Sequence, residues 1–328
     1  MYLHALNCHL HTLGYVYKHR TKYKLRSNQA LALPPSSILL QTDENCNYPD
    51  ANKISGSYTA LASSESASSL ISQANTVGII GGVSVDSTLN FLKKLVQWSS
   101  NDGKGCLPFV LCSDPLLNKE LLMHERSSMS VMRSRKELSQ LDHKPVVENL
   151  QGKRVFLEGS GARCIVMPCH ISHSWHNEVS EGCSVPFLHM GDCVARELKE
   201  AKLKPLEAGS ALRIGVLATN SALTAGFYQE YLQREGFEVV LPDKATMEHA
   251  VIPAIEATNR KDMEGAQNLL RIALQVLLVR AVNNVILASD DIRDILPKDD
   301  PLLKKCIDPM DALARSTIKW AHSVEGGT

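Results

Sequence analysis

The sequence predicts an α/β protein with two similar lobes, each a parallel sheet flanked by helices, and with a candidate active site in the interlobe cleft. Short apolar runs alternate with helix-length amphipathic segments from Val77 onward, which is typical of parallel strands joined by crossover helices. The 328 residues suit two lobes better than one core. The second half also repeats the first. Gly78 and Gly215 occupy matching early strands, and Cys169 and Ser289 follow matching late strands.

The first lobe is predicted over residues 75–205. Its first strand runs into a pair of glycines, and the next segment has apolar residues at helical spacing from Leu89 to Val96. Two further apolar runs read as strands, the second of which meets Pro168. The predicted elements are strands at 76–82, 107–114 and 163–169 and helices at 86–100, 144–161 and 190–204.

The second lobe is predicted over residues 206–308, after a loop-like join. A helix that stops at Gly236 separates its first two strands, and a long amphipathic helix precedes its third. We leave open whether the closing helix, residues 309–328, returns to the first lobe. The predicted elements are strands at 212–221, 237–243 and 282–291 and helices at 225–236, 264–281 and 309–321.

Residues 1–74 differ in composition from the rest of the chain. No acidic residue precedes Asp43, basic residues recur from Lys18 to Arg26, and residues 63–69 form a serine-rich run. These features resemble a transit peptide, and an ordinary disordered tail is the alternative. We expect import into the chloroplast, ahead of a mitochondrial or cytosolic location.

The overall composition argues against several classes of protein. Lys and Arg total 35, as do Asp and Glu, so the formal net charge is zero and no basic excess predicts nucleic-acid binding. No apolar stretch reaches the length of a membrane helix. The nine cysteines are an odd number without a CxxC pair, which predicts reduced thiols rather than a disulfide framework.

Cys169 is the main candidate for chemistry. It follows Pro168 at the end of an apolar strand, where a helix should begin. A helix N-terminus favours the thiolate, so we expect a reactive thiol whose pKa is lower than that of buried cysteines. A buried structural cysteine is the alternative. Because ligands bind outside the carboxyl ends of parallel strands, Cys169 and Ser289 are expected on opposite walls of the cleft.

Four segments together resemble the cofactor-independent aspartate/glutamate racemases. They are "GIIGGVSVDST" at 78–88, "PCHISH" at 168–173, "ATNSA" at 218–222 and "ASDD" at 288–291. The resemblance covers residues 77–321. It implies transfer of a Cα proton by two groups on opposite faces of a small acidic amino acid, aspartate or glutamate, with no cofactor.

The resemblance also implies a set of ligand contacts. Backbone N–H groups of the two turns would hold the α-carboxylate, as helix N-termini hold anions. Lys119 falls where family members carry an arginine that contacts the ligand, and a solvated helix lysine is its alternative reading. The expected substrate-binding residues are Gly81, Gly82, Val83, Ser113, Lys119, His170, Ile171, Thr219, Asn220, Ser221 and Asp290.

The chain departs from the family where the second thiol should be. Ser289 stands at that position, and a hydroxyl ionises far less readily than a thiol. Two alternatives therefore stay open: a binder of a dicarboxylate or amino acid with impaired catalysis, and a single-thiol decarboxylase or isomerase. The expected partner is a small molecule in each case, and a homodimer is left open.

Two other readings were weighed against this one. His170, His173 and His176 lie near a thiol, but no second ligand pair accompanies them, so no metal site is expected. Cys306 is an alternative source of the second thiol, on what reads as a later strand.

Overall fold

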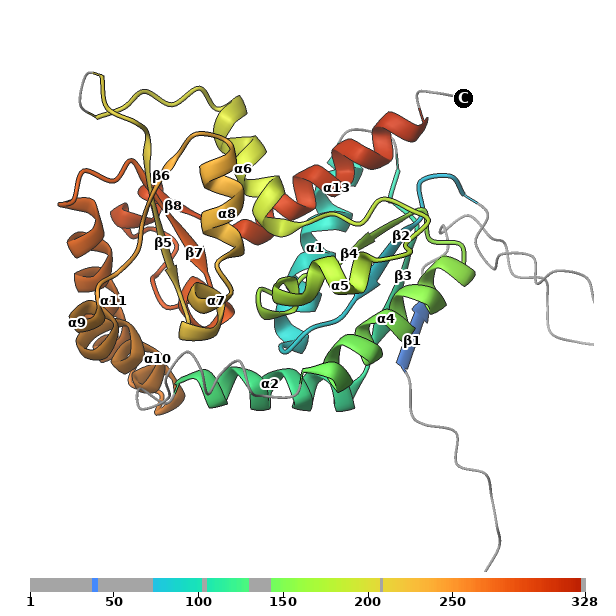
Figure 1. The fold of residues 1–328 in the computed structure, drawn as a ribbon, viewed down its shortest axis with the longest axis horizontal. Coiled ribbons are helices and arrows are strands. Elements are labelled where there is room, and N and C mark those ends of the chain that lie inside the picture. The colour runs from blue at the N-terminus through green and yellow to red at the C-terminus, as the bar shows by residue number, and fades with distance from the viewer. Residues whose placement is uncertain (1–36, 41–72, 102–104, 130–142, 207–208, 326–328) are drawn as a thin grey trace, which may run out of the picture. The chain divides into compact units, whose positions relative to one another are not determined.

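Two α/β lobes make up the folded part of the chain (Figure 1). The computed structural model describes residues 37–40, 73–101, 105–129, 143–206 and 209–325. Each lobe has one four-stranded sheet, in the order β1-β3-β2-β4 in the first and β6-β5-β7-β8 in the second. The predicted fold class is confirmed.

Parallel pairing relates the three central strands of the first sheet, β2 (Val77–Ile80), β3 (Phe109–Ser113) and β4 (Cys164–Val166). Strand β4 is shorter than predicted, and Pro168, which lacks a backbone N–H, follows it closely. The edge strand β1 (Ser37–Leu40) pairs antiparallel with β3. It lies within residues 1–74, where no folded element was predicted; residues 1–36 and 41–72 lie outside the described residues.

All pairs in the second sheet are parallel. Its strands are β5 (Arg213–Ala218), β6 (Glu238–Val240), β7 (Asn284–Ala288) and β8 (Cys306–Ile307). Strand β7 stops before Ser289 because that residue caps the short helix that follows.

Helices flank both sheets (Figure 1). Those of the first lobe are α1 (Val85–Asn101), α2 (Pro115–Met129), α4 (Lys144–Gly159), the 3₁₀ turn η1 (Ile171–Trp175), α5 (His176–Ser180) and α6 (Met190–Glu200). Those that follow are α7 (Asn220–Ala225), α8 (Phe227–Arg234), α9 (Lys244–Thr246), the π-turn η2 (Met247–Val251), α10 (Ile252–Asn259), α11 (Met263–Leu278), α12 (Asp290–Arg293), the 3₁₀ turn η3 (Pro301–Lys305) and α13 (Pro309–Glu325).

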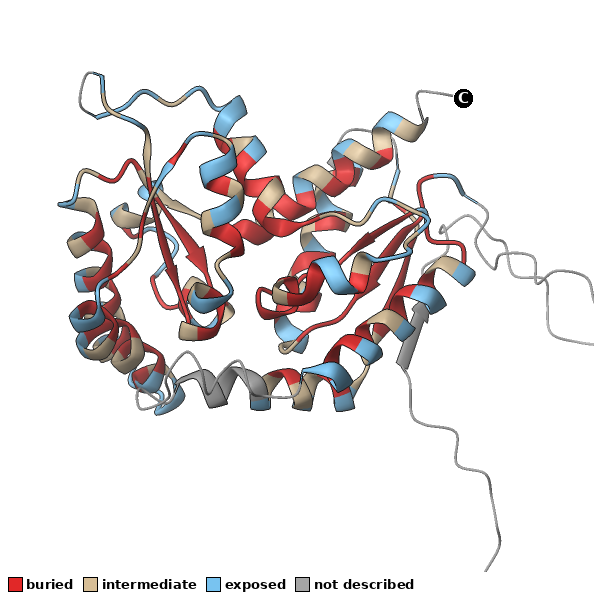
Figure 2. Ribbon diagram, in the orientation of Figure 1, coloured by how far each residue is buried: buried red, intermediate tan, exposed pale blue. Residues whose placement is uncertain are grey.

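The apolar core continues from one lobe into the other. Helix α13 packs against α1 and α6 and also contacts β7, while α6 packs against α8. One buried cluster accordingly includes Phe91 of α1, Tyr228 of α8, Ile286 of β7 and Leu313 of α13. Figure 2 shows buried residues along the strands and on the inward faces of the helices. The lobes are therefore joined by shared packing as well as by the chain.

Candidate functional site

Cys169 is held in a tight turn after β4. Its backbone N–H donates to the Met167 carbonyl at 2.8 Å, and the His173 ring Nε2 lies 2.9 Å from the same carbonyl. Because a carbonyl only accepts, His173 Nε2 carries the proton of this bond. His173 thus fixes the turn that carries the thiol, whose residue is only 2% exposed.

The predicted glycine pair approaches this turn closely. A Cβ atom on Gly82 would lie 2.6 Å from Cys169 Sγ and closer still to its Cβ, so only glycine fits there. A Cβ atom on Gly81 would lie 2.9 Å from Ser113 Oγ. Gly82 and Gly81 therefore shape the wall around the thiol, and Ser113 packs behind that wall.

Burial raises the pKa of the Cys169 thiol to about 11, against hydrogen bonds from Ser172 and the Val83 backbone that favour the thiolate. The nearby Asp290 charge raises the pKa further. The pKa thus lies above that of a free thiol because burial outweighs the hydrogen bonds. It is not raised above that of other thiols shifted by burial, since burial raises the pKa of Cys193 to about 11 and that of Cys306 to about 12. The segment after Cys169 is the five-residue turn η1 rather than the helix expected there.

A small cavity joins Cys169 to the second lobe. Its volume is about 40 Å³, room for a few water molecules. It is lined by Val83, Ser84, Cys169, His170, Ile171, Ser289, Asp290 and Asp291. Sequence reasoning thus placed two strand ends, 120 residues apart in the chain, on one cavity.

Ser289 is held at the N-terminus of α12. Its Oγ accepts a hydrogen bond from the Asp291 backbone N–H at 3.2 Å, and its side chain is buried. Because the hydroxyl acts as the acceptor in this cap, its own proton stays available to a ligand.

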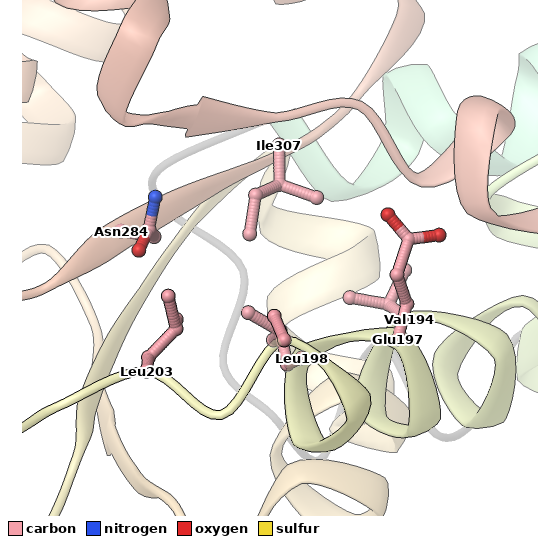
Figure 3. Close-up of a pocket in the computed structure, with 7 residues that line it drawn as sticks. Val194, Glu197, Leu198, Leu203, Asn284 and Ile307 are labelled. Carbon is pink, nitrogen blue, oxygen red and sulfur yellow. The ribbon is translucent and has the colours of Figure 1, made fainter.

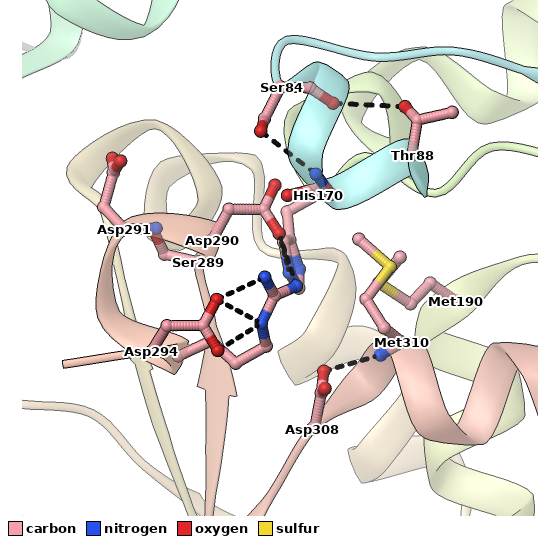
Figure 4. A network of polar contacts seen from close by, with 12 residues as sticks. Ser84, Thr88, His170, Met190, Ser289, Asp290, Asp291, Asp294, Asp308 and Met310 are labelled. Atoms are coloured by element: carbon pink, nitrogen blue, oxygen red, sulfur yellow. Dashed lines mark hydrogen bonds and ion pairs between the residues drawn. The ribbon is translucent and has the colours of Figure 1, made fainter. Parts of the chain in front are cut away.

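His170 reaches across to the second lobe (Figure 4). Its Nδ1 lies 2.9 Å from the hydroxyl of Tyr228 on α8. Its Nε2 is buried without a hydrogen-bond partner among the described residues and lies 3.8 Å from Asp290 Oδ1. Burial lowers the pKa of His170, so the ring is neutral near pH 7 and the contact with Asp290 is not an ion pair.

Asp290 and Asp291 bring two carboxylates to the cavity. Asp290 Oδ1 lies 3.3 Å from Nη1 of Arg293, which also pairs with Asp294 at 2.6 Å. Asp291 lines the cavity and is exposed as a residue, although protein partly encloses its carboxyl group. That burial and the Asp290 charge raise the pKa of the Asp291 carboxyl.

The remaining predicted contacts do not line the cavity. Lys119 is exposed on α2. Thr219 caps α7, and its hydroxyl lies 3.0 Å from that of Ser221. Gly81, Gly82, Ser113 and Asn220 are also absent from the lining. Two lining residues were missed, Ser84 and Asp291, although both adjoin the quoted motif residues.

No metal centre forms in the described part of the chain, where no group of three His, Cys, Asp or Glu side chains could hold an ion. His173 and His176 face the backbone carbonyls of Met167 and Phe187. Cys306 lies on β8 away from the cavity lining. Within the described residues, no helix has the length and apolar character that crossing a membrane requires.

A larger cavity lies elsewhere. It measures about 200 Å³ and lies where α6 meets the second sheet (Figure 3). Its lining is mostly aliphatic, with Glu197 as the one charged residue and no thiol or histidine. It therefore offers no proton-transfer group, unlike the cavity at Cys169.

Comparisons with known proteins find a family model and relatives to which this chain is similar. The family model "Asp/Glu/Hydantoin racemase" matches residues 80–317. A broad specificity amino-acid racemase of Bacillus subtilis is 26% identical over 179 residues, 54% of this chain and 73% of that protein.

Solved structures show the same fold. An aspartate racemase homologue from Pyrococcus horikoshii OT3 matches with a TM-score of 0.58 at 21% identity, over 76% of this chain and 99% of that one. The aspartate racemase of Picrophilus torridus matches with a TM-score of 0.54 at 23% identity, over 75% and 94% of the two chains.

Proposed function

The chain belongs to the Asp/Glu/hydantoin racemase family, and on this premise we propose that it is a cofactor-independent amino-acid racemase or epimerase. One observation carries the proposal: a single cavity is lined by Cys169 from the first lobe and Ser289 from the second. The two residues follow matching strands, β4 and β7. Inversion at Cα needs one proton-transfer group on each face, and two residues that enter one cavity from different lobes would meet that need.

Cys169 would act on one face of Cα. The thiolate takes the Cα proton, and the electron pair left behind is delocalised into the substrate carboxylate. Hydrogen bonds from Val83 and Ser172 favour the thiolate, but burial opposes it. The substrate must therefore help to ionise the thiol, as a positive charge placed beside it would.

The α-carboxylate would lie at the turn before α1. Backbone N–H groups at the N-terminus of a 17-residue helix favour an anion, and Val83 and Ser84 of that turn line the cavity. Ser84 Oγ already accepts a bond from the Ser87 N–H at 3.1 Å, so it helps to hold the turn in place.

Ser289 would occupy the second face as a weak acid. A hydroxyl can return a proton only slowly near pH 7 because its pKa is far from that range. We therefore propose slow racemisation with faster exchange on the Cys169 face. The single thiol among the cavity-lining residues favours a one-face reaction, such as decarboxylation or isomerisation, as the second candidate.

The side chain of the substrate is a separate question. The family resemblance implies aspartate or glutamate, which carry a second carboxylate. The described cavity lining contains no Lys or Arg to bind it, so the proposal is made for α-amino acids as a class.

Incubation in heavy water with L- and D-amino acids tests the function. Deuterium at Cα and the enantiomer ratio are read together. Exchange that is lost in Cys169→Ala supports the proposal, and exchange without inversion identifies a one-face enzyme. If binding survives while neither reaction occurs with any amino acid, the protein is a binder and the proposal fails.

The cellular location is a further part of the proposal. The absence of acidic residues before Asp43, together with the basic residues from Lys18 to Arg26, supports import into the chloroplast. A fluorescent protein fused behind residues 1–74 should enter plastids, whereas mitochondrial or cytosolic fluorescence would contradict this.

A further inference from the structure

The ionisable groups of the cavity carry negative charge. Besides the Cys169 thiol and the neutral His170 ring, its lining holds the carboxyl groups of Asp290 and Asp291. The described lining contains no Lys or Arg, and Lys119, which the family resemblance offers as a carboxylate contact, is exposed on α2. An amino acid with an acidic side chain would thus place its second carboxylate next to those of Asp290 and Asp291, which would repel it.

The cationic side chain beside the cavity, Arg293, is already engaged in ion pairs. Arg293 pairs with Asp290 at 3.3 Å and with Asp294 at 2.6 Å, and its side chain is largely buried. Arg293 is therefore shared between two carboxylates and is not free to bind a ligand. Asp291 has no ion pair with any described residue, and the Asp290 charge adds to its unfavourable environment. A bound cation at Asp291 would relieve this repulsion.

A separate observation, made at His170, indicates that the same cavity binds a ligand. The residue is only 6% exposed, and Nε2 is buried there without a hydrogen-bond partner among the described residues. A buried polar atom of this kind is stabilised when a ligand supplies the missing bond. The α-ammonium group of an amino acid can donate to an unprotonated Nε2.

We propose that the substrate is an α-amino acid with a cationic side chain, such as lysine, ornithine or arginine, whose distal charge pairs with Asp291 of the cavity lining. This inference rests on the proposed function and names its substrate class. The position of Asp291 suits a long side chain, because the residue is exposed and a substrate that reaches it can extend toward solvent. The Cα end lies at Cys169 once the cleft has opened to admit it.

The charge of the substrate also bears on the base. Burial and Asp290 disfavour the Cys169 thiolate, and a cation brought into the cleft favours it. An anionic side chain would act in the opposite direction. A cationic amino acid therefore improves both binding and ionisation, whereas an acidic one opposes both.

Substrate pairs matched in shape separate charge from size. With the full-length protein, Cα deuterium exchange is compared for arginine against citrulline, lysine against norleucine, and glutamate against glutamine. We expect kcat/KM to be at least about tenfold higher for each cationic member than for its neutral partner, and lower for glutamate than for glutamine. Faster exchange of glutamate than of glutamine overturns the inference and leaves the proposed function intact.

The variant Asp291→Asn tests the named residue. It should lower kcat/KM for arginine at least about tenfold and leave citrulline within about threefold. Asp299→Asn is the matched control, an equal change of charge at an exposed position outside the lining, and should change neither. Equal losses for arginine and citrulline in Asp291→Asn overturn the assignment.

Ligand-induced shifts in melting temperature test the inference by binding alone, without catalytic turnover. If no amino acid is exchanged but arginine stabilises the protein more than citrulline, and only through Asp291, the proposed function fails and the ligand class stands. If neither exchange nor stabilisation occurs with any cationic amino acid, the inference is overturned.

Discussion

At Cys169, burial and hydrogen bonding act in opposite directions. Burial protects the proton of the thiol, while Val83 and Ser172 offer hydrogen bonds to the thiolate. Across the cavity, Ser289 has its oxygen engaged by the backbone of Asp291. The two walls thus hold groups of very different acidity, and this asymmetry determines which substitutions should change the chemistry.

Ser289→Cys should raise racemisation. It supplies a thiol at nearly constant shape, and a positioned acid/base group is worth about 10²–10⁴-fold. The rate of enantiomer inversion is measured with the best exchanged amino acid. Adding Cys169→Ala should remove the gain because the two groups act as a unit, and Ser289→Ala should give none. An unchanged rate in a folded Ser289→Cys protein would show that this position does not face Cα.

Gly82→Ala should destabilise the site. The new Cβ would meet Cys169 Sγ at 2.6 Å, and overpacking of this kind costs about 1–3 kcal/mol. Urea unfolding measures the loss of stability, and Cα exchange should fall with it. Gly152→Ala is the matched control, because its Cβ meets nothing within 4 Å and a helix interior prefers alanine. Equal stability of the two variants would contradict the close approach.

At the level of elements, three histidines join η1, α5 and the start of α6. The rings of His173 and His189 have centroids 4.7 Å apart, as do those of His176 and His189. His189 Nδ1 accepts the Gly191 N–H and so caps α6. Burial lowers the pKa of all three, that of His189 to about 3. The cluster is therefore neutral in the folded protein.

The cluster should make the fold sensitive to acid. In the unfolded chain these histidines titrate near 6.5, so below that pH the unfolded state binds more protons. Their contribution to stability is fully present above about pH 6.5 and falls as the pH falls. His189→Asn, which keeps a capping side chain, should reduce the loss of melting temperature between pH 7.5 and 5, whereas the exposed His143→Asn should not. Equal pH dependence of wild type and His189→Asn would refute this.

Strand β1 should add modest stability to the first sheet. A chain that starts at Ser72 should still unfold cooperatively, because the other strands and the core remain. It should melt about 2–4 °C below a chain that starts at Ser36, the shift expected for about 1 kcal/mol in a protein of this size. Calorimetry compares the two. Identical midpoints would show that β1 adds nothing, and loss of the transition would show that it is essential.

The sequence predicted the central strands of both sheets well because each is a short apolar run before a turn signal. It did not predict α2 or α10 as elements, since α2 shows little separation of apolar and polar faces and α10 carries Pro253 in its first turn. The sequence identified the residues at the ends of β4 and β7 as counterparts, but it could not predict how deeply those residues are buried. Whether Cys169 is exposed depends on how closely Gly82 approaches it, and that distance is set by packing between elements distant in the chain.

On the scale of the whole molecule, the cavity at Cys169 has room for only a few water molecules, so we expect the lobes to separate when a substrate enters. Helix α13 links them through a shared core, and α7 of the second lobe contacts α2 and η1 of the first. The contacts at α7, the bond from His170 to Tyr228 and the contact from His170 to Asp290 lie near the cavity. We expect opening to break these contacts and to leave the shared core in place.

The burial of Cys169 has a consequence for chemical durability. Peroxide and alkylating reagents attack an accessible thiolate, and this thiol is neither accessible nor ionised at rest. With iodoacetamide at pH 7.5, peptide mapping should show the half-buried Cys183 labelled before Cys169, and a cationic amino acid should speed the labelling of Cys169 alone. Fast labelling of Cys169 without ligand would contradict this. The thiol would then be exposed to oxidation only while a substrate is bound. Oxidative inactivation would therefore increase with the number of turnovers rather than with the time elapsed.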